Sequence, residues 1–155
     1  MNADWAEVWS IVEDVVRAQD TFTYDPLMTE LEARDVWIEK DPGLTVVATS
    51  EDRVVGTAKM GTNRPGPGSH VATASFMVDR RHRGTGVGTA LCSYALSWAR
   101  EQGYAGMQFN AVAESNTSAV ALYERLGFAV VGTTPGAFRH PTLGRVGLLV
   151  MYCEF

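Results

Sequence analysis

The chain has 155 residues, 46% of them hydrophobic, and a formal net charge of −5. This length and composition predict one globular domain over residues 1–155. The negative charge argues against nucleic acid as a partner, because nucleic-acid binding depends on a basic surface. No apolar run approaches the length that spans a bilayer, and two cysteines are too few for a disulfide framework. We therefore expect a cytoplasmic protein without membrane contact.

The first part of the chain predicts two helices. Apolar residues recur at helical spacing over 5–16, and Asp4 with Glu7 is typical of a capping box at the start of that helix. The stretch 21–26 interrupts the pattern, and residues 31–40 predict a second helix that a following Asp-Pro-Gly ends.

Strands and helices then alternate along the rest of the chain. The expected order is strands at 44–50, 53–60 and 70–78, a helix from 87 to 103, a strand at 107–112, a helix at 117–126, and strands at 128–134 and 146–155. This order predicts an α/β (α+β) fold of one domain. Its mixed central sheet would have about six or seven strands and about four flanking helices.

The stretch RHRGTGVG at residues 81–88 connects a predicted strand to a predicted helix. The first N–H groups of a helix have no partner within the helix, and the helix dipole favours an anion there. Three alternate glycines let the backbone approach a bulky phosphate closely, and Arg80, Arg81 and Arg83 add positive charge. We predict an anion site here, in preference to an ordinary connection with solvated arginines.

The spacing of the glycines discriminates between phosphate ligands. Neither the dinucleotide pattern Gly-x-Gly-x-x-Gly nor a P-loop is present. Residues 83–88 instead resemble the Arg/Gln-x-x-Gly-x-Gly/Ala motif of the GNAT superfamily of acyl-CoA-dependent N-acyltransferases. Residues 116–128, NTSAVALYERLGF, resemble that family's other recurring segment. The likeness runs from about Leu44 to the C-terminus and weakens over residues 1–43.

The resemblance implies an enzyme that transfers an acetyl group from acetyl-CoA to a primary amine of a small molecule or amino-acid-like acceptor. The amine would attack directly in a ternary complex, and no metal is implied. Residues in three places would serve acetyl-CoA. Backbone groups of Phe76, Met77 and Val78 would contact the pantetheine arm; Arg83, Gly84, Thr85, Gly86, Val87, Gly88 and Thr89 would bind the pyrophosphate; Asn116 would hydrogen-bond the pantetheine, and Tyr123 would be the catalytic acid beside the thioester sulfur.

Several assignments have a structural alternative. Asn116 is also a good N-cap for the following helix, and Tyr123 shares a helix face with core residues. The general base stays open, with four side chains or a water as candidates. These side chains are Asp25, Glu30, His70 and Glu114.

The acceptor side is the least determined by the sequence. Acidic residues of the early loop and second helix predict a negative rim that would attract an amine; they are Asp25, Glu30, Glu32 and Asp35. Aromatic residues that could line an acceptor pocket are Phe22, Tyr24, Trp37 and Phe138, with core packing favoured for Trp37. Alternative functions are a regulatory protein that binds acyl-CoA and an enzyme that acetylates a protein or peptide amine. The sequence also leaves open an acyl group longer than acetyl and assembly as a homodimer.

Overall fold

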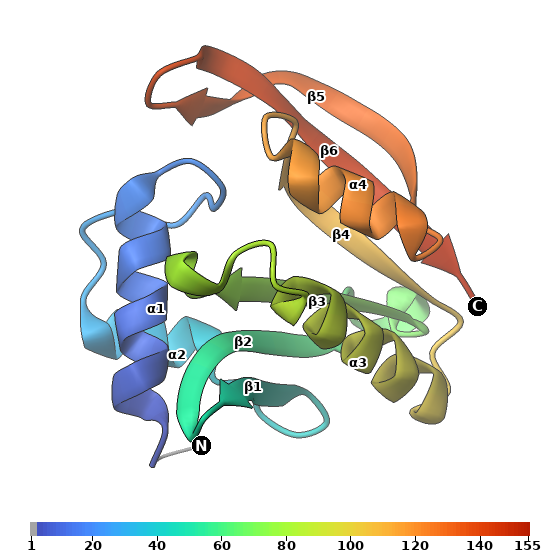
Figure 1. The fold of residues 1–155 in the computed structure, drawn as a ribbon. Helices are drawn as coiled ribbons and strands as arrows, with labels where there is room; N and C mark the ends of the chain where they lie inside the picture. The colour runs from blue at the N-terminus through green and yellow to red at the C-terminus, as the bar shows by residue number, and fades with distance from the viewer. Residues whose placement is uncertain (1–2) are drawn as a thin grey trace.

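The computed structural model describes residues 3–155, and its element order agrees with the sequence prediction (Figure 1). The helices are α1 (Trp5–Ala18), α2 (Glu30–Trp37), α3 (Val87–Glu101) and α4 (Thr117–Arg125), with short 3-10 turns η1 (Gly66–Gly68) and η2 (Arg80–His82). The strands are β1 (Leu44–Ser50), β2 (Arg53–Thr62), β3 (Val71–Val78), β4 (Gly106–Ala113), β5 (Ala129–His140) and β6 (Gly144–Glu154). This six-stranded mixed sheet with four α-helices confirms the predicted fold class.

The sheet is divided into two parts. Its strand order is β1-β2-β3-β4-β6-β5, and every neighbouring pair is antiparallel except β3 and β4. These two parallel strands pair only at Val71 with Gly106 and at Ala72 with Met107, and they separate beyond that point. In Figure 1, β4, β6, β5 and α4 accordingly diverge from the part formed by β1, β2, β3 and α3.

Two apolar clusters cover the opposite faces of the sheet. One cluster joins α3 and α4 to the sheet and includes Phe76 and Phe109, whereas the other joins α1 and α2 to it and includes Met77. Because successive strand residues point to opposite faces, Phe76 and Met77 mark these two sides. Trp37 is fully buried in the second cluster and donates its indole N–H to Thr57 Oγ1 at 3.0 Å, which makes it a core residue.

The predicted helix ends need two corrections. Asp4 makes no side-chain capping bond to α1, so the predicted capping box there is wrong. A capping residue requires an extended backbone, whereas the backbone of Asp4 is helical. The capping box lies instead at α2, where Glu32 N donates to Thr29 Oγ1 and Thr29 N donates to Glu32 Oε2. Hydrogen bonds from Thr29 lower the pKa of the Glu32 carboxyl. Helix α2 ends at Trp37, three residues before its predicted end, because Ile38 is extended.

The C-terminal hairpin is longer than predicted. β5 continues through Pro135 and Gly136 to His140, where the sequence pattern indicates an end at residue 134. A shift of register between Thr134 and Phe138 accommodates these two residues. Irregularities of this kind let a strand continue past proline and glycine, which the sequence pattern marks as breaks.

Candidate active site

A cavity of about 680 Å³ lies where β3 and β4 separate. Its walls include β3 residues 73–78 and β4 residues 109–113. Tyr123 of α4 lines it from one face of the sheet, and the loop residues 21–24 that follow α1 line it from the other. Because α4 and α1 cover opposite faces, the cavity passes through the opening in the sheet.

The strand β3 offers unpaired backbone groups to this cavity. On one side it pairs with β2 from Ala72 to Val78, but on the other only Val71 and Ala72 pair with β4. The peptide groups of residues 73–78 that point toward β4 therefore have no strand partner in the described part of the chain. Buried N–H and C=O groups require a hydrogen-bond partner, so an extended ligand with amide groups could bind here as an added strand.

The glycine loop follows directly from β3 at one end of the cavity. Gly84 and Gly86 have φ of 74° and 91°, and a Cβ added at either would meet no atom within 4 Å. Their backbone conformation and an approaching ligand, rather than crowding by neighbours, therefore account for glycine at both positions. Gly86 is the N-cap of α3 and no side chain caps that helix, so the first N–H groups of α3 remain available to an anion.

Most of the predicted acetyl-CoA residues line the cavity. They are Phe76, Met77, Val78, Arg83, Gly84, Gly86, Gly88, Thr89, Asn116 and Tyr123. Two others do not. Val87 packs against the core beside Leu91, and Thr85 donates its hydroxyl to the carbonyl of His82. Any contribution of Val87 and Thr85 to ligand binding would therefore come from their backbone.

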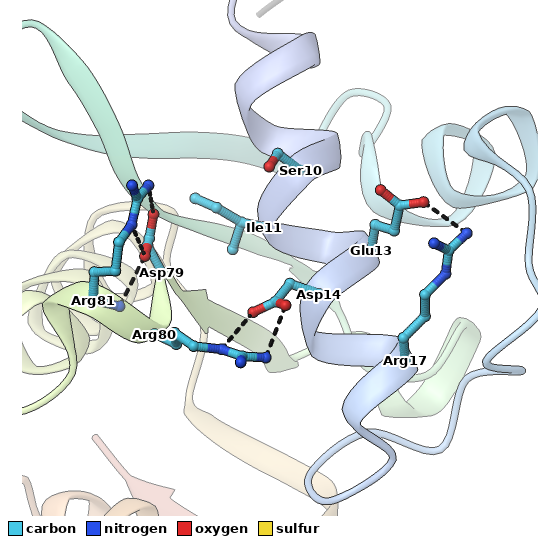
Figure 2. A pocket seen from close by; sticks show the side chains of 8 residues that line it. All are labelled: Ser10, Ile11, Glu13, Asp14, Arg17, Asp79, Arg80 and Arg81. Atoms are coloured by element: carbon cyan, nitrogen blue, oxygen red, sulfur yellow. Dashed lines mark hydrogen bonds and ion pairs between the residues drawn. The ribbon is translucent and has the colours of Figure 1, made fainter.

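The three arginines of the loop have different surroundings. Figure 2 shows Arg80 held by Asp14 of α1, with nitrogen to oxygen distances of 2.8 and 3.0 Å, and Arg81 held by Asp79 at 2.7 Å. Both arginines border a separate hollow of about 400 Å³, while Arg83 lines the main cavity. The hydrogen bond from the Arg81 guanidinium lowers the pKa of the Asp79 carboxyl to about 2. Arg83 is thus the arginine of this cluster placed to meet a ligand in the cavity.

Asn116 and Tyr123 lie on the α4 side of the cavity. Asn116 occupies the N-cap position but makes no capping bond; its Oδ1 accepts a hydrogen bond from Ser118 Oγ at 3.4 Å. The Tyr123 ring packs 4.6 Å from the Phe109 ring and 6.2 Å from the Phe76 ring, measured between centroids. Burial, with a smaller effect of the Cys92 thiol, raises the pKa of the Tyr123 phenol. Tyr123 is therefore both a packing aromatic and a protonated hydroxyl group at the cavity.

The model of the Acetyltransferase (GNAT) family matches residues 9–128. The chain belongs to the GNAT family. Among solved structures, a GCN5-related N-acetyltransferase from Kribbella flavida is 47% identical, with a TM-score of 0.97 over the whole of this chain and 94% of that one. A ribosomal-protein-alanine N-acetyltransferase from Brucella melitensis is 27% identical, with a TM-score of 0.83 over 100% of this chain and 96% of that one.

The curated relatives of this GNAT chain are longer than the segment they share with it. N-acetyltransferase aca1 of Schizosaccharomyces pombe is 29% identical over 77% of this chain and 64% of its own length. Other curated relatives are matched over 14% to 38% of their length. The chain thus spans less than two thirds of the curated relatives it matches.

None of the four predicted candidates for the general base lines the cavity of this GNAT domain. Three of them accept structural hydrogen bonds: Asp25 from Leu27 N at 2.8 Å, Glu30 from the Trp5 indole at 2.9 Å, and Glu114 from Gly147 N at 2.9 Å. The fourth, His70, lies just before β3, at the end opposite the glycine loop. Among the residues described, no carboxylate lines the cavity, and no group of three His, Cys, Asp or Glu side chains could hold a metal ion.

The acceptor side also differs from the sequence prediction. The four acidic residues of the expected rim do not line the cavity, and Trp37 and Phe138 are buried outside it. Phe22 and Tyr24 do line it, with stacked rings 5.7 Å apart. His82, which belongs to the basic stretch 81–88, and Arg125, which no sequence pattern singled out, line it as well. None of the helices in residues 3–155 has the length and apolarity required to cross a membrane.

Proposed function

We propose that this chain is an acetyl-CoA-dependent N-acetyltransferase that transfers the acetyl group directly to a primary amine. The observation that carries the proposal is the cavity through the sheet. It joins the glycine loop at one end to the aromatic loop 21–24 at the other, with Tyr123 among its lining residues. Membership of an acetyltransferase family supports the same reaction.

Acetyl-CoA would bind along β3. Its pyrophosphate would accept hydrogen bonds from the N–H groups of residues 84–89, and Arg83 would add a charge-assisted contact. The pantetheine amides would pair with the free backbone of residues 76–78, and the side chain of Asn116 would hold the arm from the α4 side. Each of these groups borders the cavity, except Thr85 and Val87, which would act through the backbone.

The reaction then needs no covalent enzyme intermediate. The nitrogen lone pair of the neutral amine attacks the thioester carbon, a C–N bond forms, and the C–S bond breaks with its electron pair leaving on sulfur. A backbone N–H of β3 would stabilise negative charge on the carbonyl oxygen. Tyr123 would give its proton to the departing thiolate, since its phenol is protonated at neutral pH.

The amine must also lose a proton. No carboxylate lines the cavity in residues 3–155, so we propose that water in the open part of the cavity accepts it. This choice replaces the four side chains considered from sequence, three of which are engaged in hydrogen bonds outside the cavity.

Calorimetry with acetyl-CoA, followed by a screen of amines for release of free CoA thiol, tests the proposal. We expect one acetyl-CoA per chain and thiol release only when an amine is present. Failure to bind acetyl-CoA would overturn the proposal. Binding without turnover of any primary amine, including peptide N-termini, would favour the alternative of a regulatory GNAT-fold protein.

A further inference from the structure

Three side-chain amides form a hydrogen-bonded row near the point where β3 and β4 separate. Gln108 Nε2 donates to Asn110 Oδ1 at 2.9 Å, and Asn110 Nδ2 donates to Asn63 Oδ1 at 2.7 Å. Gln108 and Asn110 belong to β4, whereas Asn63 directly follows β2, on the far side of β3. The amide group of Asn110 is therefore held from both ends at the place where β3 and β4 separate.

Of these three amide side chains, Asn110 lines the cavity. Its neighbour Phe109 points toward α4 and packs against Tyr123, so Asn110 points to the opposite face, where α1 and the aromatic loop lie. Asn110 of β4 and Ser75 of β3 both line the opening. An amide oxygen has two lone pairs and an amide nitrogen two hydrogens, so Asn110 keeps one of each for a ligand.

The charge of the cavity lining restricts what can bind. Among the described residues that line the cavity, Arg83 and Arg125 are cationic and none is a carboxylate. A carboxylate would favour the ammonium form of a bound amine, whereas positive neighbours disfavour it. A neutral amide oxygen accepts a hydrogen bond from the amine without adding negative charge, and so leaves the nitrogen lone pair free to react.

The body of the acceptor would meet an apolar surface. Phe22 and Tyr24 line the same side of the cavity, stacked 5.7 Å apart, and Phe22 packs edge-on against Trp37. Such a surface suits a flat or apolar group. A polycation would place its further ammonium groups near the basic lining residues.

We infer that Asn110 binds the acceptor amine through its Oδ1, and that the acceptor is a single primary amine on a small apolar or aromatic body. This inference rests on the proposed N-acetyltransferase function. The hydrogen bonds to Gln108 and Asn63 orient Asn110, and the stacked rings of Phe22 and Tyr24 cover the rest of the acceptor.

The test measures release of CoA thiol with 2-phenylethylamine and with spermine as probes, for the wild type and three variants. We expect turnover of 2-phenylethylamine with kcat/KM at least about tenfold above that for spermine. Loss of one neutral hydrogen bond in Asn110→Ala should raise the KM for 2-phenylethylamine roughly fivefold to tenfold. Asn63→Ala keeps the Asn110 amide in the cavity, and should raise the KM for 2-phenylethylamine only about twofold. Acetyl-CoA affinity, measured by calorimetry, should stay within about twofold in both.

Asn110→Asp separates binding of the amine from a merely structural role. A carboxylate beside the amine should move the acidic limb of the kcat/KM profile about one unit to higher pH, whereas Asn110→Ala should leave it in place. The wild-type protein can be saturated with a non-reactive analogue of acetyl-CoA, so that no turnover occurs. Addition of 2-phenylethylamine to this complex should shift the side-chain NH₂ signals of Asn110 in nitrogen-15 NMR spectra. This measurement needs no variant to fold.

The outcomes are distinct. If the wild type does not bind acetyl-CoA, the proposed function fails, and this inference fails with it. If acetyl-CoA binds but spermine is the better acceptor, or 2-phenylethylamine neither reacts nor shifts the Asn110 signals, the inference alone is overturned. Asn63→Ala and Asn110→Ala could raise the KM for 2-phenylethylamine equally, with no change of the kcat/KM pH profile in Asn110→Asp. That result would overturn the inference and leave the three amides a structural role only.

Discussion

The two ends of the cavity are built in different ways. The proposed donor end comes from one short stretch, β3 and the loop to α3, and offers mainly backbone groups. The proposed acceptor end comes from side chains far apart in the sequence, on the loop 21–24 and on Asn110. A contiguous backbone site leaves a recognisable spacing in the sequence, whereas an assembled side-chain site leaves none.

Replacement of Gly86 by Val should damage the donor end most. Gly103 at the end of α3 is a matched control, since its φ of 83° is also positive and its Cβ position is equally open, but it does not line the cavity. Both variants should lose about 1–2 kcal/mol or more of unfolding free energy, because left-handed backbone is strained for a residue with a Cβ. Only Gly86→Val should lose acetyl-CoA affinity, by roughly 100-fold or about 2.7 kcal/mol in calorimetry. A folded Gly86→Val protein with wild-type affinity would place the anion site elsewhere.

Tyr123 lines the stretch between the two ends, and removal of its hydroxyl should affect chemistry rather than binding. Tyr123→Phe should lower kcat about 100-fold, the lower range for general acid catalysis, because the packed ring is retained. Acetyl-CoA affinity should change little. Tyr94→Phe, on the exposed side of α3 and outside the cavity, should leave both unchanged.

The pH profile adds a second check on the same residue. Burial raises the pKa of Tyr123, so this phenol should keep its proton at and above its ordinary value of about 10. The value of kcat, measured where chemistry limits the rate, should therefore begin to fall only above pH 10, as Tyr123 loses its proton. A Tyr123→Phe enzyme with undiminished kcat would leave Tyr123 as a core aromatic alone.

Arg83 and Arg80 should differ in their effect on the donor end. Arg83 lines the cavity, and loss of one charge-assisted hydrogen bond in Arg83→Gln should weaken acetyl-CoA binding roughly tenfold. Arg80 is paired with Asp14, so Arg80→Gln should have little effect. Titrations at low and high salt should show a smaller salt dependence for Arg83→Gln than for the wild type. The reverse order of the two arginines would contradict the proposed orientation of the ligand.

Asp79 should contribute the smallest effect, on stability. Its carboxyl accepts hydrogen bonds from the backbone N–H and the guanidinium of Arg81, which lower its pKa to about 2. A lowered pKa stabilises the fold above the unfolded value near pH 4, and this stabilisation is lost as pH falls toward 2. Asp79→Asn should therefore cost about 1 kcal/mol at pH 7, after allowance for the exposed Arg81, and almost nothing near pH 2 in urea titrations. Asp35→Asn, on exposed α2 surface, should cost little at either pH.

The sequence could predict the element order and the position of the glycine loop between β3 and α3, because both depend on local patterns. The alternation of strand and helix patterns, and glycines at 84, 86 and 88, are visible without any knowledge of long-range contacts. The end of β5 could not be predicted, since the register shift that carries it past Pro135 depends on pairing with β6. The Asp4 capping box failed because the pattern does not specify the backbone angles at Asp4.

The acceptor end was harder to predict because residue type does not reveal the direction of a side chain. Glu30 and Glu114 have suitable chemistry for a base, but each is engaged by a hydrogen-bond donor outside the cavity. Asn110 was visible as a polar residue in a strand, yet its partner Asn63 is 47 residues away. Only the folded chain brings the two together.

The two-residue contact between β3 and β4 gives this sheet an additional pair of edges, in its interior rather than at its rims. Exposed edges attract other strands and promote aggregation, so the gap between β3 and β4 is a liability for the protein. A pantetheine arm bound in the gap would cover both interior edges. Stability would then depend on ligand supply, since a ligand at 100 times its Kd adds about 2.7 kcal/mol to the folded state. The lifetime of the protein would consequently follow the concentration of its own donor substrate.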